Sequence, residues 1–148
     1  ELVVYMECYG GAVTSMLGLY DVIKGIEIPT TCLCSGMVAS AATVLLQAFT
    51  TRLALPHTSI HLHEAGIMPS GSDREMLTVL EETFLEIKRL NTLIVEVIGD
   101  RIGKHLPEIL AKMRGGREVN MSAQDALKYG LIDEIVTSYK IKSEEKLD

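Results

Sequence analysis

Apolar residues form two strand-turn-helix units near the start of the chain. Residues 2–8 are an apolar, β-rich run that ends at a pair of glycines, and residues 12–25 then place apolar side chains at helical spacing. A second apolar run, residues 30–34, passes through Ser35 and Gly36 into a helical segment that contains Ser40. The pattern therefore predicts a strand, a turn and a helix twice in succession.

Near-continuous apolar strands that alternate with helices are typical of a mostly parallel sheet covered on both faces. The pattern then continues with shorter segments: apolar runs at 51–56 and 59–64, a helix near 105–114, a capped helix at 122–130 and a strand at 131–136. The run at 59–64 alternates with the strand period of two. We therefore expect one α/β domain at residues 1–137, followed by a charged tail at 138–148.

The longest helix signal begins at Ser72, where Glu75 completes a capping box, and ends at Ile98 before a glycine. Its main apolar stripe includes Leu80 and Phe84. A helix of this length projects beyond the core of a small domain. Its second apolar row then needs cover from another chain, which favours an oligomer; the row consists of Met76, Leu90, Leu93 and Val97.

Composition excludes several classes of partner. The 148 residues are 47% hydrophobic and 23% charged, which is ample for a packed core. The net charge is -6 and the basic residues are scattered, so we expect no nucleic acid, and no apolar run is long enough to cross a membrane. Three cysteines in apolar segments favour a reducing compartment. The chain opens in mid-strand, so we expect an N-terminal portion to be missing.

Few residues could carry chemistry. Ser40 follows a strand and precedes small alanines, which suits a nucleophile but also an ordinary packed helix. His61 and His63 share one strand face, which suits a metal pair, a half-buried strand or a catalytic base. Gly10 and Gly11 suit a simple turn, or a backbone N–H that approaches a ligand closely. Spacing alone leaves these alternatives open.

Four ordered segments resemble the proteolytic subunit of Clp protease. They read YMECYGGAVTSMLGLYDVI, TTCLCSGMVASAATVLL, LALPHTSIHLHE and MSAQDALKYGLIDEIV, and together they span roughly residues 1–136. The resemblance implies a ClpP/crotonase-type α/β fold with repeated strand-turn-helix units. It also implies that the long helix, 72–98, is the projecting handle through which two rings of this family interlock.

The resemblance implies roles for particular residues. Ser40, four places after Gly36, matches the nucleophile, and His63, seven places after Pro56, matches the general base. Glu118, four places before Ser122, stands where the family has the aspartate of its triad. Glutamate is one methylene longer, so Glu118 either completes the triad or is a solvated surface carboxylate.

The same carry-over assigns the backbone N–H groups of Gly11 and Ala41 to the oxyanion hole. A peptide substrate is expected to lie as an added strand between Ala12 and Val13 on one side and Ile67 and Met68 on the other.

Two further departures from the family pattern leave both oxyanion donors in place. Tyr9 replaces a proline in the turn before the first helix, and Ala41-Ala42 replaces the family's methionine and glycine after the nucleophile.

The resemblance implies a cytoplasmic serine endopeptidase subunit without a cofactor, although an organelle matrix remains an alternative location. It would form heptameric rings, stacked in pairs, and receive unfolded polypeptides from an AAA+ unfoldase that uses the ATP. Three alternatives remain: a non-catalytic ring subunit, a crotonase-like acyl-CoA hydratase or isomerase, and a metal-binding module that uses His61 and His63.

Overall fold

The computed structural model describes residues 1–66 and 76–138, and the side chains of 76–79 are not considered. Its strands are β1 (Leu2–Cys8), β2 (Thr30–Ala39), β3 (Thr51–Ala54), β4 (Ser59–Leu62), β5 (Val119–Ser122) and β6 (Glu134–Ile135). Its helices are α1 (Val13–Lys24), α2 (Ala41–Leu46), α3 (Met76–Ile102), α4 (Leu106–Met113) and α5 (Ala123–Tyr129), with a short 3-10 turn, η1 (Gly103–His105), between α3 and α4. Within these ranges no helix is both long and apolar enough to cross a membrane.

The six strands form one sheet, in the order β5-β4-β2-β3-β6, with β1 also paired to β2. Every pairing is parallel except that of β4 with β5. The α/β fold with its mostly parallel sheet and repeated strand-turn-helix units is therefore confirmed. The antiparallel strand β5 was not predicted, because its four residues are too short to show a clear period, although they do alternate between buried and exposed.

Strand β2 is longer than predicted. It continues through Gly36 to Ala39, because residues Met37–Ala39 pair with β4. Gly36 has a left-handed φ of 55°, and a Cβ there would collide with the carboxylate of Glu7, so this position needs glycine. Helix α2 consequently begins only at Ala41. Ser40 lies in the turn between strand and helix, and its predicted position inside the helix is wrong.

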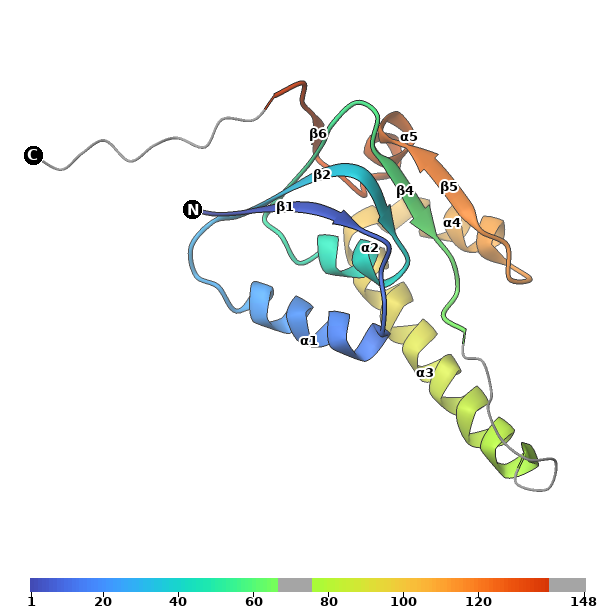
Figure 1. Cartoon of the computed structure of the whole chain (residues 1–148). Coiled ribbons are helices and arrows are strands. Elements are labelled where there is room, and N and C mark those ends of the chain that lie inside the picture. Colours follow the sequence, from blue (N-terminus) through green and yellow to red (C-terminus); the bar gives the residue numbers. More distant parts are fainter. Residues whose placement is uncertain (67–75, 139–148) are drawn as a thin grey trace, which may run out of the picture.

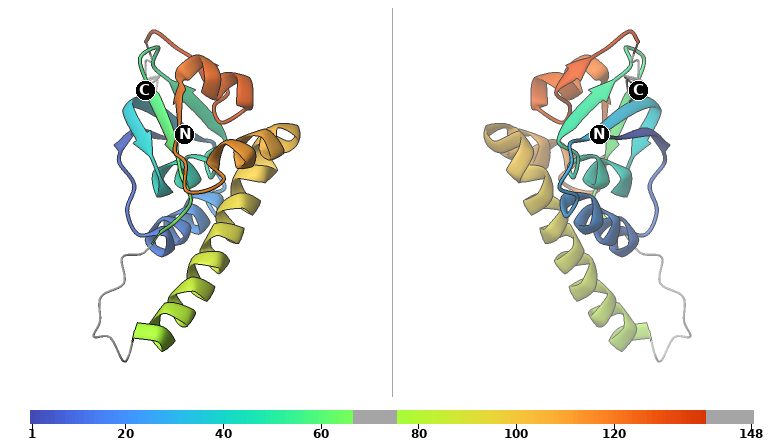
Figure 2. Two further views of the ribbon diagram at one scale, coloured as in Figure 1. Left: turned by 90° about the vertical axis from the view of Figure 1, so that its right-hand side faces the viewer. Right: turned by 90° about the vertical axis from the view of Figure 1, so that its left-hand side faces the viewer.

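The strands share a buried core with α2, the C-terminal half of α3, α4 and α5. Figure 1 shows α1 and α2 on the same side of β1 and β2. Helix α2 is almost wholly buried, including the side chains of Ala41 and Ala42. In both views of Figure 2, the N-terminal half of α3 runs clear of the sheet. The long projecting helix is thus confirmed.

Helix α3 differs in detail from its prediction. Its predicted capping residues, Ser72 and Glu75, lie outside the described residues. At the other end the helix passes Gly99 and reaches Ile102. A Cβ at Gly99 would lie 2.8 Å from Leu106 Cδ2, so this glycine lets α4 pack closely and does not end the helix.

The burial of α3 also differs from the predicted stripe. Leu90, expected to need a partner chain, is only 7% exposed, whereas Phe84 and Leu85 are 65% and 64% exposed. The reason is position along the helix: Leu90 lies over the core, and Phe84 lies on the half that projects beyond the sheet. The apolar surface left open is therefore at the projecting end.

A buried arginine joins strand β3 to the segment just before β6. Arg52 on β3 is 4% exposed, and its guanidinium bonds both carboxylate oxygens of Asp133, at 3.0 Å from Nε and 2.5 Å from Nη2. Its Nη1 also donates to Gln47 Oε1 at the end of α2. Burial would raise the pKa of Asp133, but hydrogen bonds from the Arg52 side chain and backbone outweigh this and hold the pKa below its ordinary value.

The C-terminal segment begins as predicted. Ser122 and Asp125 form a reciprocal capping box at the start of α5, and Gly130 ends the helix in the left-handed conformation. The strand predicted at 131–136 is reduced to the two residues of β6. The predicted tail lies, after Ser138, outside the described residues.

Candidate active site

Ser40 is held in a strained conformation at the turn between β2 and α2. Its φ of 57° and ψ of -131° make it the one non-glycine residue with positive φ in the described part of the chain. Such backbone strain costs about 1–3 kcal/mol and collects at functional sites. Two hydrogen bonds from Thr43 to the Ser40 carbonyl, at 2.6 and 3.0 Å, and one from the Ser40 amide fix the turn.

Ser40 as a residue is half-buried, and among the described residues its hydroxyl has no hydrogen-bond partner. The amide of Ser40 donates to the carbonyl of His61 at 2.8 Å, which ties the turn to β4. The backbone is therefore fixed while the hydroxyl stays available for chemistry.

The glycine pair approaches Ser40 closely. A Cβ on Gly10 would lie 2.8 Å from the Cβ of Ser40 and 3.0 Å from the amide nitrogen of Ala41, and Gly10 has a φ of 94°. Sequence reasoning did not find this requirement for the first glycine, because nothing in the sequence shows that the end of β1 passes over the turn. The amide of Gly10 is taken up by Cys8 Sγ, at 3.4 Å.

Gly11 and Ala41 are the predicted oxyanion donors. Gly11 is open, with no atom within 4 Å of a Cβ built on it, and its φ of 154° also favours glycine. Ala41 is the first residue of α2, so its N–H has no partner within the helix. The close approach of Gly10 to Ala41 brings these two backbone segments together beside Ser40.

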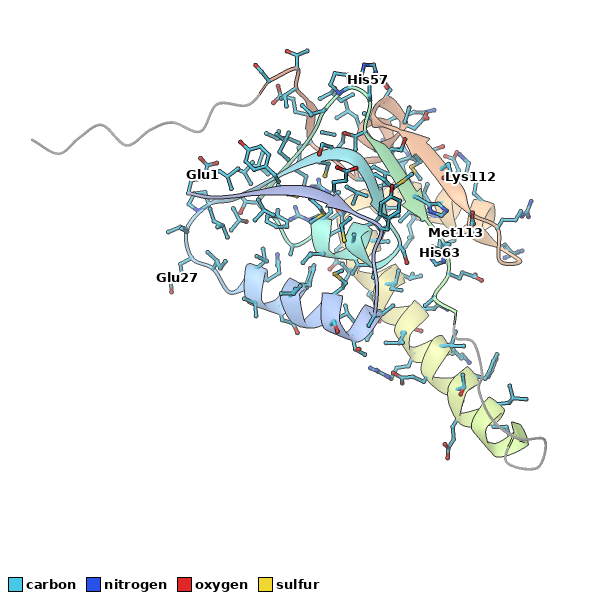
Figure 3. The ribbon with its side chains drawn as sticks, viewed as in Figure 1. Glu1, Glu27, His57, His63, Lys112 and Met113 are labelled. Atoms are coloured by element: carbon cyan, nitrogen blue, oxygen red, sulfur yellow. The ribbon has the colours of Figure 1, made fainter. Side chains whose placement is uncertain are left out.

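His63 lies just beyond the end of β4. Figure 3 shows His63 and His57 at opposite ends of this strand, so His57 is remote from the turn. His63 Nδ1 lies 2.8 Å from the carbonyl oxygen of Glu64. Because a carbonyl only accepts, Nδ1 carries the proton and the lone pair of a neutral ring is on Nε2. Within the described structure no hydrogen bond joins His63 to Ser40.

Glu118 contacts a different histidine from the one predicted. Antiparallel pairing places His61 opposite Asn120 and Leu62 opposite Val119, which carries Glu118 to the end of β4 where His63 lies. Its Oε2 lies 3.4 Å from His61 Nε2, within ion-pair range. The geometry is not that of a hydrogen bond, and the buried Nε2 has no other partner in the described structure. Glu118 is not brought into contact with His63.

His61 is close to both Glu118 and His63, and the family resemblance assigns it no role. Its ring and that of His63 have centroids 5.6 Å apart, with planes inclined by 31°. The strand period of two places both histidines on one face, which suits a metal pair, a half-buried strand or a catalytic base, but it predicts no contact of His61 with Glu118. Among the described side chains, no group of three or more His, Cys, Asp or Glu residues is arranged to hold a metal ion.

A cleft of about 330 Å³ lies beside the glycine pair, and Gly11 is one of its lining residues. The segment from Gly11 to Thr14 lines one side, Ala65 and Gly66 line the other, and Glu86 and Leu90 of α3 complete it. Ala12 and Val13, which are predicted to bind the peptide, line this cleft. Ile67 and Met68, predicted for its opposite side, lie outside the described residues and directly follow Gly66.

A serine at a strained strand-to-helix turn, packed against a glycine pair and hydrogen-bonded through its backbone to the strand that leads into His63, defines a candidate nucleophile site in an α/β fold. The chain belongs to the Clp protease family, whose model matches residues 1–139. This confirms the resemblance seen in the sequence.

Curated relatives agree with this family. The chain is 33% identical to an ATP-dependent Clp protease proteolytic subunit of Bacteroides fragilis over 138 residues, which is 92% of this chain and 64% of the relative. Proteins of the same name from Mesostigma viride and Chlorokybus atmophyticus are each 34% identical over 90% of this chain and 57% of the relative. The chain therefore spans less than two thirds of these relatives.

Proposed function

We propose that this chain is a serine endopeptidase subunit of a ring-shaped, ATPase-dependent protease. The observation that carries the proposal is the Ser40 hydroxyl, which lacks a hydrogen-bond partner in the described structure and stands on a strained turn that abuts the glycine pair. A residue that only filled space in a buried helix would have no need of this conformation.

The reaction follows from the groups around the turn. His63 Nε2 takes the proton of Ser40 as Oγ forms a bond to the peptide carbonyl carbon. The N–H groups of Gly11 and Ala41 stabilise the oxyanion, each by about 100- to 1,000-fold in rate. Collapse of the intermediate breaks the C–N bond, and the leaving amine takes the proton from His63. Water, activated by the same histidine, then hydrolyses the acyl-enzyme and restores Ser40.

The substrate is an unfolded polypeptide in extended form. The cleft between Ala12-Val13 and Ala65-Gly66 has backbone on both sides, so main-chain hydrogen bonds would supply most of the affinity. Ile67 and Met68 would continue its second side. Binding through the main chain makes cleavage weakly dependent on sequence.

The assembly belongs to the same proposal. Heptameric rings stacked in pairs would cover the exposed Phe84 and Leu85 on the projecting half of α3. An AAA+ unfoldase would deliver substrates and hydrolyse ATP, and this chain would need no cofactor. We place the assembly in the cytoplasm, with an organelle matrix as the alternative.

The test is active-site labelling of the purified, assembled protein with a fluorophosphonate, which bonds to an activated serine as fluoride leaves. We expect labelling of wild type and loss of labelling in both Ser40→Ala and His63→Ala. Ser35→Ala, a matched serine change in β2, should label normally. Absence of labelling in correctly assembled wild-type protein would overturn the peptidase proposal.

A non-catalytic ring subunit is the second candidate, and one observation favours it: Glu118 contacts His61 and not His63. Unlabelled rings that assemble normally would support it. The hydratase or isomerase alternative lacks support from the relatives' names and would require coenzyme A binding. The metal-module alternative would require stoichiometric zinc in the purified protein.

A further inference from the structure

We infer that His61 is a positioning residue that couples Glu118 to the catalytic base His63. The inference rests on the proposed function and adds to it a residue that orients the base. It starts from a geometric fact: among the described residues, His61 is in contact with all three groups of the predicted triad.

The three contacts use different parts of His61. Its carbonyl oxygen accepts the amide of Ser40 at 2.8 Å. Its Nε2 lies 3.4 Å from Glu118 Oε2, and its ring lies 5.6 Å, centroid to centroid, from that of His63. A displacement of His61 would therefore shift both the turn that carries Ser40 and the ring of His63.

The hydrogen bonding of His63 explains why its orientation needs help from a neighbour. Its Nδ1 is already bonded to the Glu64 carbonyl, so a carboxylate cannot occupy that position without displacing the carbonyl. Glu118 instead contacts His61. The Nε2 atom of His61 is buried and has no hydrogen-bond partner in the described structure. A buried ring nitrogen without a partner costs free energy, which the nearby carboxylate reduces.

The chemistry of the pair also fits a positioning role. The His61 side chain is only 19% exposed, so its ring has little room to rotate and presents a fixed surface to His63. Glu118 is 63% exposed and shares its surroundings with Lys112 and Arg117, which line the same hollow beside β5. Glu118 therefore favours one orientation of the His61 ring, and the His61 ring limits the rotation of His63.

The experiment compares the ring NMR signals of both histidines at one pH in wild type and in Glu118→Gln, with Glu134→Gln as a matched loss of charge on β6. We expect Glu118→Gln to change the ring NMR signals of His61 clearly and those of His63 by less, because Glu118 contacts the His61 ring directly and His63 only through it. Glu134→Gln should change neither. A larger shift at His63 than at His61, or no shift at either, would overturn the inference.

The second measurement is a double-mutant cycle on the rate of fluorophosphonate labelling. His61→Gln and Glu118→Gln should each slow labelling about tenfold, and the double variant should be no slower than His61→Gln alone, because the two residues act as a unit. Additive losses of labelling rate, in variants that all fold and assemble normally, would overturn the inference. If wild type does not label but Glu118→Gln still changes the His61 ring signals, the pairing stands and the peptidase proposal fails.

Discussion

The backbone amide of Ser40 donates a 2.8 Å hydrogen bond to the carbonyl of His61, so the turn that carries the candidate nucleophile is bonded to β4, which contains His61 and leads directly to His63. Parallel pairing of β2 with β4 ends one residue earlier, at Ala39 and His61. The bond is thus the last link of the ladder. It holds the backbone of the strained turn at a fixed distance from the segment that contains His63, and proton transfer between two side chains requires such fixed geometry.

Gly10→Ala should destabilise the protein and abolish labelling of Ser40. The new methyl group would lie 2.7 Å from the carbonyl oxygen of Ala39 and 2.8 Å from the Cβ of Ser40, at a φ of 94°. We expect a loss of about 1–3 kcal/mol in the free energy of unfolding, measured by urea denaturation.

Gly18→Ala is the matched control for that loss. Gly18 lies in α1, and no atom lies within 4 Å of a Cβ built there. This change should stabilise the protein by about 0.5–1 kcal/mol. A Gly10→Ala variant as stable and as reactive as wild type would contradict the close packing of the glycine pair on the nucleophile turn.

Asn91→Leu should raise KM for peptide substrates more than it lowers kcat. The Asn91 amide accepts from the N–H of Ala65 at 2.8 Å and donates to the carbonyl of the same residue at 3.3 Å, so α3 holds one wall of the cleft through this side chain. Loss of both bonds leaves the wall free to move. Peptide hydrolysis kinetics test this, and Thr92→Ala, the exposed neighbour, should have wild-type KM.

Asp133→Asn should destabilise the protein by about 2–3 kcal/mol near neutral pH, because it leaves the buried Arg52 without its carboxylate. Urea denaturation of Asp133→Asn and of Glu134→Gln measures this. The exposed Glu134 next to it should tolerate the matched change within about 0.5 kcal/mol.

The same ion pair predicts a pH dependence. The pKa of Asp133 is lower in the folded protein than in the unfolded chain. Its contribution to stability is therefore complete above the ordinary pKa of an aspartate and is lost as the pH falls through the lowered value. Unfolding measured between pH 7 and pH 3 should show a stability loss that is smaller in Asp133→Asn. Equal pH slopes in wild type and variant would contradict the assignment.

Gly99→Ala should loosen the junction of α3 and α4. The added methyl group would lie 2.8 Å from Leu106 Cδ2. Cδ2 is at the end of the Leu106 side chain, which can move. We therefore expect a loss of about 1–2 kcal/mol in the free energy of unfolding and not a failure to fold. A melting temperature equal to or above that of wild type would show that the two helices are not packed as closely as described.

Much of the fold was predictable because long apolar segments report their own period. β1, α1 and the capped helix α5 were located from such patterns, and so was the projecting helix. Gly36 and Gly99 misled the prediction for one physical reason: both were interpreted as local breaks, whereas both are required by a neighbour far along the chain. A single sequence contains no sign of Glu7 over Gly36 or of Leu106 against Gly99.

The candidate site divides in the same way. Ser40, His63 and the glycine pair follow from ordered motifs, and the structure brings their segments together. The contact of Glu118 with His61 depends on how a long side chain crosses between β5 and β4, which spacing does not determine. A glutamate reaches further along the neighbouring strand than an aspartate, and the diagonal neighbour becomes its partner.

The buried start of α2 has a consequence for anyone who wishes to redesign this protein. Ala41 and Ala42 contribute to the core and directly follow the candidate nucleophile, so substitutions there would change folding and the proposed activity together. Ala12 and Thr14, in contrast, are exposed and line the cleft. A library that aims at new cleavage preferences should therefore be built on the β1–α1 side, where variation can be explored without disturbing the interior.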